Sequence, residues 1–353
     1  MKIALLTIWH EKNFGAELQA YATVKILRTL GYEIDIIDIR LSDIRRLSCK
    51  GKIVDFFMSI GSGSRSFFRF WNKNFHTTRR YKSLAEIQKR PPQADVYMVG
   101  SDQVWNPDIT RDFALLYFLD FGSEKIHRIS YASSFGVNTW THDEYYNEVK
   151  SLLNRFSYIS CRESSGVKLL KEKFQLESEH VLDPTLLLDD YSEFIGDIKE
   201  QDTLVYYPLS KDFELENYSV NLANSLGLTV INNNKIKKLF GRIPWDMVGI
   251  EEWIRNIAQS RFVITRSFHG LAFCLIFKRQ FAILESRNGR GERLTSLLSI
   301  LGLSERLYKD VAALDRARPW EIKIDYDIID ARLKAEREKS IKFLTRSLKD
   351  INL

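Results

Sequence analysis

The sequence is organised around RFVITRSFHGLAF, residues 261–273. Its residues 262–265 form a short apolar, β-branched run typical of a buried strand in a parallel sheet. Ser267 is a favoured helix N-cap and an apolar run follows it, which predicts a helix. A strand that leads straight into a helix presents free backbone N–H groups above the sheet edge, where anions bind in open α/β folds. Arg266, Ser267 and His269 are therefore candidate ligand-binding residues; the alternative is a core histidine beside a surface arginine.

Length and composition indicate two globular domains. The chain has 353 residues, 44% of them hydrophobic and 28% charged, which is typical of a soluble protein. Its net charge of +6 suits an anionic substrate, an acidic membrane surface or a nucleic acid and does not choose among them.

Cysteine and histidine usage indicates a cytoplasmic protein without a structural metal. The three cysteines are far apart and show no CxxC spacing, which favours a reducing compartment. The six histidines show no ligand spacing, so no metal is expected. No apolar run reaches the roughly 18–20 residues of a membrane helix, and residues 1–9 are expected to form a strand rather than a signal peptide.

The first domain is expected to span residues 1–190. Residues 2–9, 16–30 and 33–40 read as strand, helix and strand, the opening of a doubly wound domain. Asn13 and Gly15 lie in the loop where such folds hold a ligand, although an ordinary tight turn is the alternative. The loop is not a GxGxxG fingerprint, so dinucleotide binding is not predicted.

A basic and aromatic insertion, residues 41 to about 90, interrupts this domain. Arginines and lysines alternate with aromatic residues along it, and Gly61–Ser64 reads as a flexible hinge. Such a composition fits a helical hairpin in peripheral contact with an anionic membrane. The alternative is an insertion that packs its aromatic residues on the body of the protein.

Four further strands of this domain are each followed by small, polar or charged residues. The strands are 94–100, 128–132, 158–161 and 180–182, followed by Ser101 and Asp102, Ser133, Arg162, and Asp183 respectively. The carboxyl ends of parallel strands meet at one edge of a sheet. These side chains are therefore predicted to share one functional edge.

A second α/β domain is expected over residues 200–320, followed by a C-terminal segment, 321–353, whose long charged helix packs across both domains. The predicted strand 280–284 ends in a loop that carries three arginines and two glycines before the next helix. The arginines are Arg287, Arg290 and Arg293. This loop can wrap an anion, or it is a solvated charged loop.

Taken together, six motifs resemble those of the polysaccharide pyruvyl transferase family, in the expected order from about residue 2 to 307. They are Asn13-Phe14-Gly15, Gly100-Ser101-Asp102, SYASSFG at 130–136, RESSG at 162–166, Asp183-Pro184-Thr185 and Ser267-Phe268-His269-Gly270. The resemblance implies two facing Rossmann-like domains, as in the GT-B glycosyltransferases. It also implies transfer of pyruvate from phosphoenolpyruvate to a sugar of a bacterial exopolysaccharide or capsule precursor, with release of phosphate and no cofactor.

The resemblance also suggests roles for particular residues. The basic-plus-histidine element of the family falls on Arg266 and His269, with the arginine three residues before the histidine rather than two. His269 is expected to act on the phosphate or as the acid/base, and Asp102 as a base or hydrogen-bond partner for the acceptor hydroxyls. Arg266, Arg162 and one or more of Arg287, Arg290 and Arg293 are expected to hold the donor anions through their guanidinium groups. The first domain is expected to be the acceptor side and the second the phosphoenolpyruvate side.

Two alternative functions remain open from the sequence. One is a sugar-nucleotide-dependent glycosyltransferase of the same fold, and the other is a non-catalytic carbohydrate-binding relative. The acceptor is free, nucleotide-linked or lipid-linked, and the basic insertion favours the lipid-linked form. No nucleic acid is expected as a partner, because the basic stretch contains no recognisable nucleic-acid-binding module.

Overall fold

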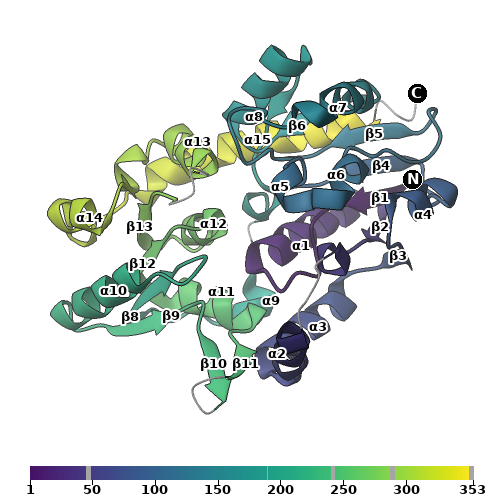
Figure 1. Cartoon of the computed structure of the whole chain (residues 1–353). Coiled ribbons are helices and arrows are strands. Elements are labelled where there is room, and N and C mark those ends of the chain that lie inside the picture. The colour runs from purple at the N-terminus through teal and green to yellow at the C-terminus, as the bar shows by residue number, and fades with distance from the viewer. Residues whose placement is uncertain (45–48, 189, 240–242, 287–290, 350–353) are drawn as a thin grey trace. The chain divides into compact units, whose positions relative to one another are not determined.

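The computed structural model describes residues 1–44, 49–188, 190–239, 243–286 and 291–349. The chain forms two compact units, and each consists of separate stretches of sequence. The first unit contains residues 1–46, 74–188 and 333–353, and the second contains 47–73 and 189–332. Each unit has a five-stranded sheet at its centre (Figure 1).

In the first unit, the sheet has the strand order β3-β2-β1-β4-β5 and all neighbours are parallel. The strands are β1 Lys2–Leu6, β2 Glu33–Asp38, β3 Thr77–Arg80, β4 Val96–Val99 and β5 His127–Ser130, with a short parallel pair formed by β6 Ser160–Cys161 and β7 Glu179–His180. The helices are α1 Phe14–Thr29, α4 Leu84–Lys89, α5 Pro107–Thr110, α6 Ala114–Tyr117, α7 Tyr146–Leu153 and α8 Ser164–Leu169.

In the second unit, the sheet has the order β14-β13-β12-β8-β9 and is again fully parallel. The strands are β8 Gln201–Tyr207, β9 Thr229–Asn232, β12 Ser260–Thr265, β13 Gln280–Leu284 and β14 Leu307–Tyr308, with an antiparallel hairpin formed by β10 Ile236–Leu239 and β11 Ile243–Met247. The helices are α2 Cys49–Ile60, α3 Ser62–Asn74, α9 Ser192–Ile195, α10 Phe213–Ser225, α11 Ile250–Gln259, α12 Phe268–Ile276, α13 Glu292–Leu301 and α14 Val311–Ala317.

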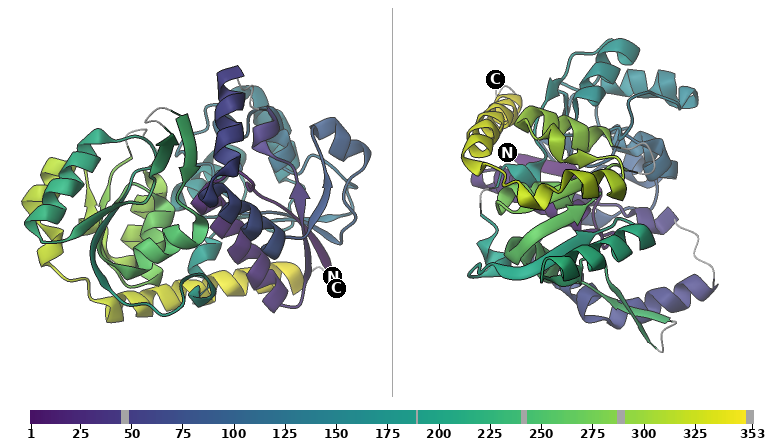
Figure 2. Two further views of the ribbon diagram at one scale, coloured as in Figure 1. Left: turned by 90° about the horizontal axis from the view of Figure 1, so that it is seen from below. Right: turned by 90° about the vertical axis from the view of Figure 1, so that its left-hand side faces the viewer.

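The two cores are built by the apolar runs that the sequence places on these strands. In the first unit, Trp105 is fully buried and stacks on Phe118 with ring centroids 5.6 Å apart. In the second unit, residues 204–207 of β8 and 262–265 of β12 are all buried, because helices cover the sheet (Figure 2). Thus the expected α/β class with two Rossmann-like domains is confirmed.

Both sheets contain a point at which the strand order reverses. In the first unit the chain adds β2 and β3 on one side of β1 and then β4 and β5 on the other, so the reversal lies between β1 and β4. In the second unit it lies between β8 and β12. Ligands of open α/β sheets bind outside the carboxyl ends of the strands at such a reversal. The loops after these four strands are therefore the candidate ligand-binding regions of the two units.

The insertion differs from the sequence expectation in two ways. Residues 41–90 were assigned to the first domain, whereas 47–73 belong to the second unit. Gly61–Ser64 was predicted to be a hinge, yet α3 begins at Ser62. A Cβ on Gly63 would lie 2.0 Å from the Met247 carbonyl oxygen, so this glycine permits close approach of two backbones rather than flexibility.

A buried carboxylate fixes the insertion to the β10–β11 hairpin. Asp246 is 1% exposed and accepts hydrogen bonds from the Gly63 N–H and the Ser62 hydroxyl, both at 2.8 Å, and from Lys237 Nζ at 3.1 Å. Burial alone would raise the pKa of Asp246, but these donors lower it below its ordinary value. The Ser66 hydroxyl is hydrogen-bonded to the Glu251 carboxylate, which joins α3 to α11.

The Gly63→Val substitution is expected to detach the insertion from the hairpin. The added side chain would overlap the Met247 backbone, and moving α3 away would break the Gly63–Asp246 hydrogen bond. The free energy of unfolding should fall by about 2 kcal/mol, which urea denaturation measures. Limited proteolysis should cut within 61–73 more rapidly than in the wild type. Gly291→Ala is the control, because its Cβ meets nothing within 4 Å; equal losses in both variants would contradict the packing argument.

The last helix, α15 Tyr326–Lys349, contributes to both units. Its first turns belong to the second unit, where the Tyr326 hydroxyl donates to the Cys274 carbonyl. The remainder belongs to the first unit, where the Ser340 hydroxyl accepts a hydrogen bond of 2.9 Å from the Leu182 N–H. The helix therefore packs on each unit with a different part of its length, as the sequence predicts.

Candidate functional site

In the second unit, the predicted strand–helix junction is present at the carboxyl end of β12. Ser267 caps α12, and its hydroxyl accepts a hydrogen bond of 3.2 Å from the Gly270 N–H. A Cβ on Gly270 would lie 2.7 Å from the Thr265 hydroxyl, so the first turn of α12 packs directly against the strand end. His269 lies in this turn, is 7% exposed and makes an edge-to-face contact with Phe268. His269 is therefore held rigidly at the positive end of the helix dipole.

Arg266 links the two strands that flank the reversal of this sheet. Its Nε donates to Asp212 Oδ2 at 3.0 Å, and Nη1 donates to the Glu285 carbonyl. Asp212 follows β8 and also caps α10 through a 3.2 Å hydrogen bond from the Leu215 N–H. Because Arg266 is only about one-tenth exposed, the ion pair is largely shielded from water. It joins the β8 end to the β12 end.

A cavity of about 590 Å³ opens beside this ion pair. It lies at the carboxyl ends of β8 and β9, and its lining includes Asp212, Asn232 and three lysines, Lys211, Lys235 and Lys238. Lys211 Nζ lies 4.1 Å from the centre of the Phe213 ring. The three lysines outnumber the two carboxylates of the lining, Asp212 and Glu216, so the cavity has a net positive lining that suits an anionic ligand.

Of the three arginines predicted in the loop after β13, one lies within the described residues. Arg287 and Arg290 lie outside the described residues. Arg293 lies in the first turn of α13 and is half-buried. The prediction that these arginines hold an anion stays a prediction.

In the first unit, the loop after β1 is tied to the start of α1. Asn13 caps α1 by accepting a 3.2 Å hydrogen bond from the Ala16 N–H, and Gly15 is buried in the first helical turn. Glu17 is fully buried and accepts backbone hydrogen bonds from residues 10 and 11. These contacts hold the loop over the β1 end, with the Asn13 side chain exposed.

Arg162 connects two other strand ends of this unit. Its Nη1 lies 2.8 Å from Asp183 Oδ2 and its Nη2 lies 3.3 Å from Asp102 Oδ1. The guanidinium is fully buried, and although burial by itself lowers its pKa, the carboxylates of Asp183 and Asp102 hold the pKa above its ordinary value. Ser101 donates to the same Asp183 oxygen at 2.9 Å. Arg162 and Ser101 thus have buried partners within the protein.

Asp102 is the most accessible member of this group. It has a left-handed backbone, with φ +74°, and its carboxylate retains 16% exposure. Asp102 Oδ1 accepts a hydrogen bond of 2.9 Å from the Gln103 backbone N–H and another from the Arg162 guanidinium. Ser133 is completely buried and donates to the Gly100 carbonyl at 2.9 Å, which keeps the β4 and β5 ends together. The predicted edge therefore contains one partly exposed carboxylate supported by buried polar residues.

The β1 loop also contains a titratable group that sequence analysis did not single out. His10 has φ +61°, and the pKa of its imidazole falls to about 4 because of burial and the nearby Arg40 guanidinium. The unfolded chain therefore binds a proton between about pH 6.5 and 4 that the folded chain does not bind, so this contribution to stability is lost as the pH falls through that range.

The His10→Asn substitution is expected to flatten the pH dependence of stability. Asparagine tolerates the left-handed backbone and has no charge in this range. After allowance for partial exposure, the wild type should lose about 2 kcal/mol more than the variant between pH 7 and 4. Urea denaturation at a series of pH values measures the difference, and parallel curves for the two proteins would contradict it.

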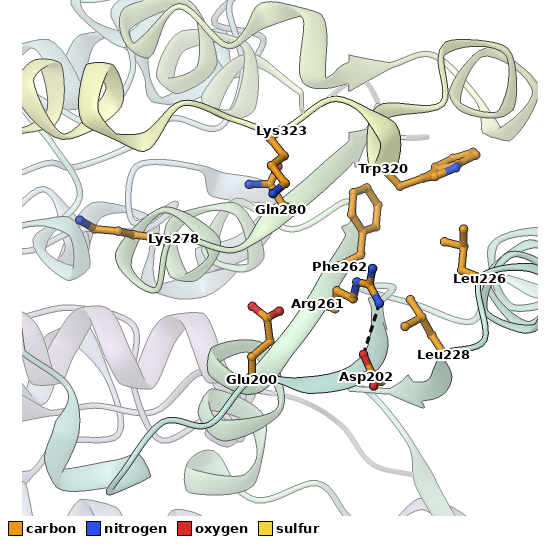
Figure 3. A pocket seen from close by; sticks show the side chains of 10 residues that line it. All are labelled: Glu200, Asp202, Leu226, Leu228, Arg261, Phe262, Lys278, Gln280, Trp320 and Lys323. Carbon is orange, nitrogen blue, oxygen red and sulfur yellow. Dashed lines mark hydrogen bonds and ion pairs between the residues drawn. The ribbon is translucent and has the colours of Figure 1, made fainter.

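Another cavity, of about 490 Å³, lies at the opposite edge of the second sheet (Figure 3). Asp202, Arg261 and Lys278 line it where β8, β12 and β13 begin. Arg261 Nη1 is paired with Asp202 Oδ1 at 3.3 Å, as the dashed line in Figure 3 marks. The cavity is at the amino ends of the strands, which is not where ligands bind in this type of sheet.

The described residues also bear on metal binding and on membrane spanning. Within the described part of the chain, no three His, Cys, Asp or Glu side chains are grouped so that they could hold a metal ion. None of the helices there combines the length and apolar character needed to cross a membrane.

Sequence analysis missed Asp212 and the lysine-lined cavity. Asp212 is separated from Arg266 by 54 residues, and only the strand order brings them together. The signal that could have found it is its position after a predicted strand, the same signal that identified Asp102.

Known structures define the class of fold. The chain matches Glycyrrhiza uralensis UGT73P12, complexed with glycyrrhetinic acid 3-O-monoglucuronide, with a TM-score of 0.56, 11% identity, and coverage of 100% of this chain and 96% of that one. It matches Arabidopsis thaliana UGT89C1, complexed with UDP-L-rhamnose, with a TM-score of 0.53, 12% identity and coverage of 100% and 99%. The architecture is that of the GT-B glycosyltransferases. A search of curated proteins gives no significant match.

The family follows from a different comparison. The model of the polysaccharide pyruvyl transferase family matches residues 13–288, which is well over half of the chain. The chain belongs to this family. The resemblance carried by the sequence motifs is thereby confirmed.

Proposed function

We propose that this chain transfers pyruvate from phosphoenolpyruvate to a sugar of a cell-surface polysaccharide or its precursor, forming a cyclic ketal and releasing phosphate. Membership of the family supports a transferase that acts on polysaccharide. The single observation that carries the proposal is the buried His269 in the first helical turn after β12, at the strand-order reversal. The reaction needs no cofactor and takes place in the cytoplasm.

The donor binds at the carboxyl edge of the second unit in this proposal. Phosphoenolpyruvate carries a phosphate and a carboxylate, and the amide groups at the start of α12 favour an anion. Ser267 and His269 lie beside those amides, and Arg266 holds the adjacent β8 and β12 ends together. The arginines of the loop after β13, Arg287, Arg290 and Arg293, supply further positive charge. The lysines of the neighbouring cavity attract the donor.

The chemistry assigns His269 a proton-transfer role. A proton adds to the vinyl carbon, which becomes a methyl group, and the carbon that bears the phosphate develops oxocarbenium character. One sugar hydroxyl attacks that carbon, phosphate leaves, and a second hydroxyl attacks to close the ketal. The two hydroxyl protons end on the methyl carbon and on phosphate. A positioned imidazole can move one of these protons.

The acceptor binds at the edge of the first unit in this proposal. Asp102 is the partly exposed carboxylate there and accepts a proton or a hydrogen bond from a sugar hydroxyl. Asn13 caps α1 and Gly15 lies in the first turn of that helix, after the β1 loop. Because the Arg162, Ser101 and Ser133 side chains are buried against protein groups, we assign them as positioning residues rather than as direct contacts.

The direct test measures phosphate release from phosphoenolpyruvate with a panel of galactose-, glucose- and mannose-type acceptors, some free and some lipid-linked. Mass spectrometry should find an acid-labile pyruvate ketal on the acceptor that supports release. Phosphate release without a ketal, or no release with any acceptor, counts against the proposal.

A nucleotide-sugar-dependent glycosyltransferase is the second candidate. The observation that favours it is the 590 Å³ cavity, which has room for more than a three-carbon donor, on a fold that resembles an α-glucosyltransferase in complex with UDP with a TM-score of 0.50 and 9% identity over all of both chains. A rise in melting temperature with a nucleotide sugar, but not with phosphoenolpyruvate, would favour this candidate. Sugar binding without either reaction would indicate a non-catalytic relative.

A further inference from the structure

The net charge of the chain is concentrated in two short segments. Residues 49–74 and 235–247 together contain nine lysines and arginines and two aspartates, a formal charge of +7, whereas the whole chain has +6. The segments are separated by 160 residues of sequence. The described residues of the two segments, 49–74, 235–239 and 243–247, lie side by side in the structure, because the α2–α3 junction packs against β11 (Figure 1). We call this the α2–α3/hairpin surface.

One of the two aspartates offsets a single basic side chain of this surface. Asp246 is buried, and besides the donors of the insertion it pairs with Lys237, whose Nζ lies 3.1 Å from Asp246 Oδ2. The side chains described on α2, α3, β10 and β11 include no exposed carboxylate, whereas Arg65, Arg69 and Lys238 are exposed and add to the charge that Lys237 shares with Asp246. The surface therefore presents positive charge to the solvent.

Large apolar side chains are exposed among these basic residues. Phe56 is 64% exposed and Phe68 58% exposed, and on the hairpin Trp245 is 36% exposed. Ile60 and Ile236 are about half exposed. Exposed aromatic residues interspersed with arginine and lysine are a combination found where proteins meet the headgroup region of a bilayer.

Helix α3 shows how the exposed face is separated from the packed face. Gly63, Ser66 and Phe70 are buried. The centroid of the Phe70 ring lies 5.8 Å from the centroid of the Phe194 ring of α9. Arg65 and Phe68, which lie between them in sequence, are exposed, so the packing of α3 is complete without them. The exposed face of α3 therefore does not take part in the packing of this helix on the second unit.

We propose that the α2–α3/hairpin surface binds a bilayer that contains anionic lipids, peripherally and from one side. The basic side chains pair with lipid phosphates, and the exposed phenylalanine and tryptophan side chains enter the interface between headgroups and acyl chains. The surface combines a segment that sequence analysis singled out with a hairpin that it did not. The inference stands on charge and exposure and does not rest on the proposed reaction.

Vesicle co-sedimentation of the full chain tests the proposal. Vesicles of 30% phosphatidylglycerol in phosphatidylcholine should bind the protein at low salt, and pure phosphatidylcholine vesicles should bind it much less. The Arg65→Glu/Arg69→Glu variant should bind the anionic vesicles at least about 25-fold more weakly, at about fivefold for each basic residue removed. Phe56→Ser/Phe68→Ser should also weaken binding, and high salt should weaken the wild type.

Matched variants on another surface of the same unit separate this role from a general effect of charge. Arg316→Glu and Ile322→Ser change an exposed basic and an exposed apolar residue of the second unit and should bind vesicles as the wild type does. Unchanged melting temperatures show that each variant folds. The proposal is overturned if anionic and neutral vesicles bind equally, if both sets of variants behave alike, or if the protein binds RNA or a soluble polyanion but not vesicles.

Discussion

Replacing His269 by alanine or glutamine is expected to lower the rate of phosphate release from phosphoenolpyruvate by about a hundred- to ten-thousand-fold, the usual contribution of a positioned acid or base. The imidazole is fixed in the first turn of α12, where Ser267 caps the helix and Gly270 packs against Thr265. The loss should fall mainly on kcat, because the donor keeps the helix amides and the surrounding cations as binding groups.

The glutamine variant guards against a trivial loss of structure, because it retains most of the volume of a side chain that is 7% exposed. Its melting temperature should stay close to that of the wild type. His127→Ala, at the exposed start of β5 in the first unit, is the matched control and should retain full activity. If His269→Gln keeps near-normal phosphate release with an accepted sugar, then His269 has no role in the chemistry.

Replacing Arg162 by leucine is expected to destabilise the protein by about 3–5 kcal/mol. The substitution leaves the Asp183 and Asp102 carboxylates without their buried counter-charge, and Asp183 is only 1% exposed. An uncompensated buried charge costs far more than a lost surface pair. The expected result is a large shift of the urea midpoint together with loss of activity through displacement of Asp102.

Two variants distinguish this structural role from direct contact with the donor. The double variant Arg162→Leu/Asp183→Leu should recover part of the lost stability, because it removes both members of the closer pair. Arg261→Leu, which breaks the exposed pair with Asp202, should cost no more than about 1 kcal/mol. A stable Arg162→Leu protein with a raised KM for phosphoenolpyruvate would show instead that Arg162 contacts the donor.

Most of the helices and strands could be predicted because they depend on patterns of neighbouring residues. The strand at 262–265 and the helix after Ser267 are an apolar β-branched run and a capping residue, and both are present as β12 and α12. Strands β3 and β14 were not predicted. The β3 sequence, Thr-Thr-Arg-Arg, has no apolar alternation, and its pairing with β2 is fixed by the neighbouring strand rather than by its own residues.

The site residues were predicted by their place after strands, but their partners were not. Sequence analysis found Arg266 and Arg162, whose charge suggested anion binding. The structure gives Arg266 the Asp212 carboxylate and Arg162 two buried carboxylates, from positions far away in the sequence. Whether an arginine faces a ligand or a buried acid depends on strand order and burial, which a single sequence does not contain.

The unit to which the insertion belongs could not be predicted for the same reason, because its contacts are with residues far away in the sequence. Residues 47–73 interrupt the first unit, so sequence order alone assigns them to it. Their anchors, Asp246 and Glu251, lie more than 180 residues further along the chain. The glycine–serine stretch was therefore interpreted as a hinge, although its small side chains are needed for close contact with β11.

The division of the chain has a consequence for how the protein is made. The backbone passes from one unit to the other four times, at 46/47, 73/74, 188/189 and 332/333. A ribosome that has synthesised residues 1–188 has not yet produced the second half of α15, on which the Leu182 backbone depends. The first unit cannot complete its folding before residues 333–353 are made, and no single cut in the gene would separate the two units. We therefore expect this protein to fold largely after synthesis, as one cooperative whole.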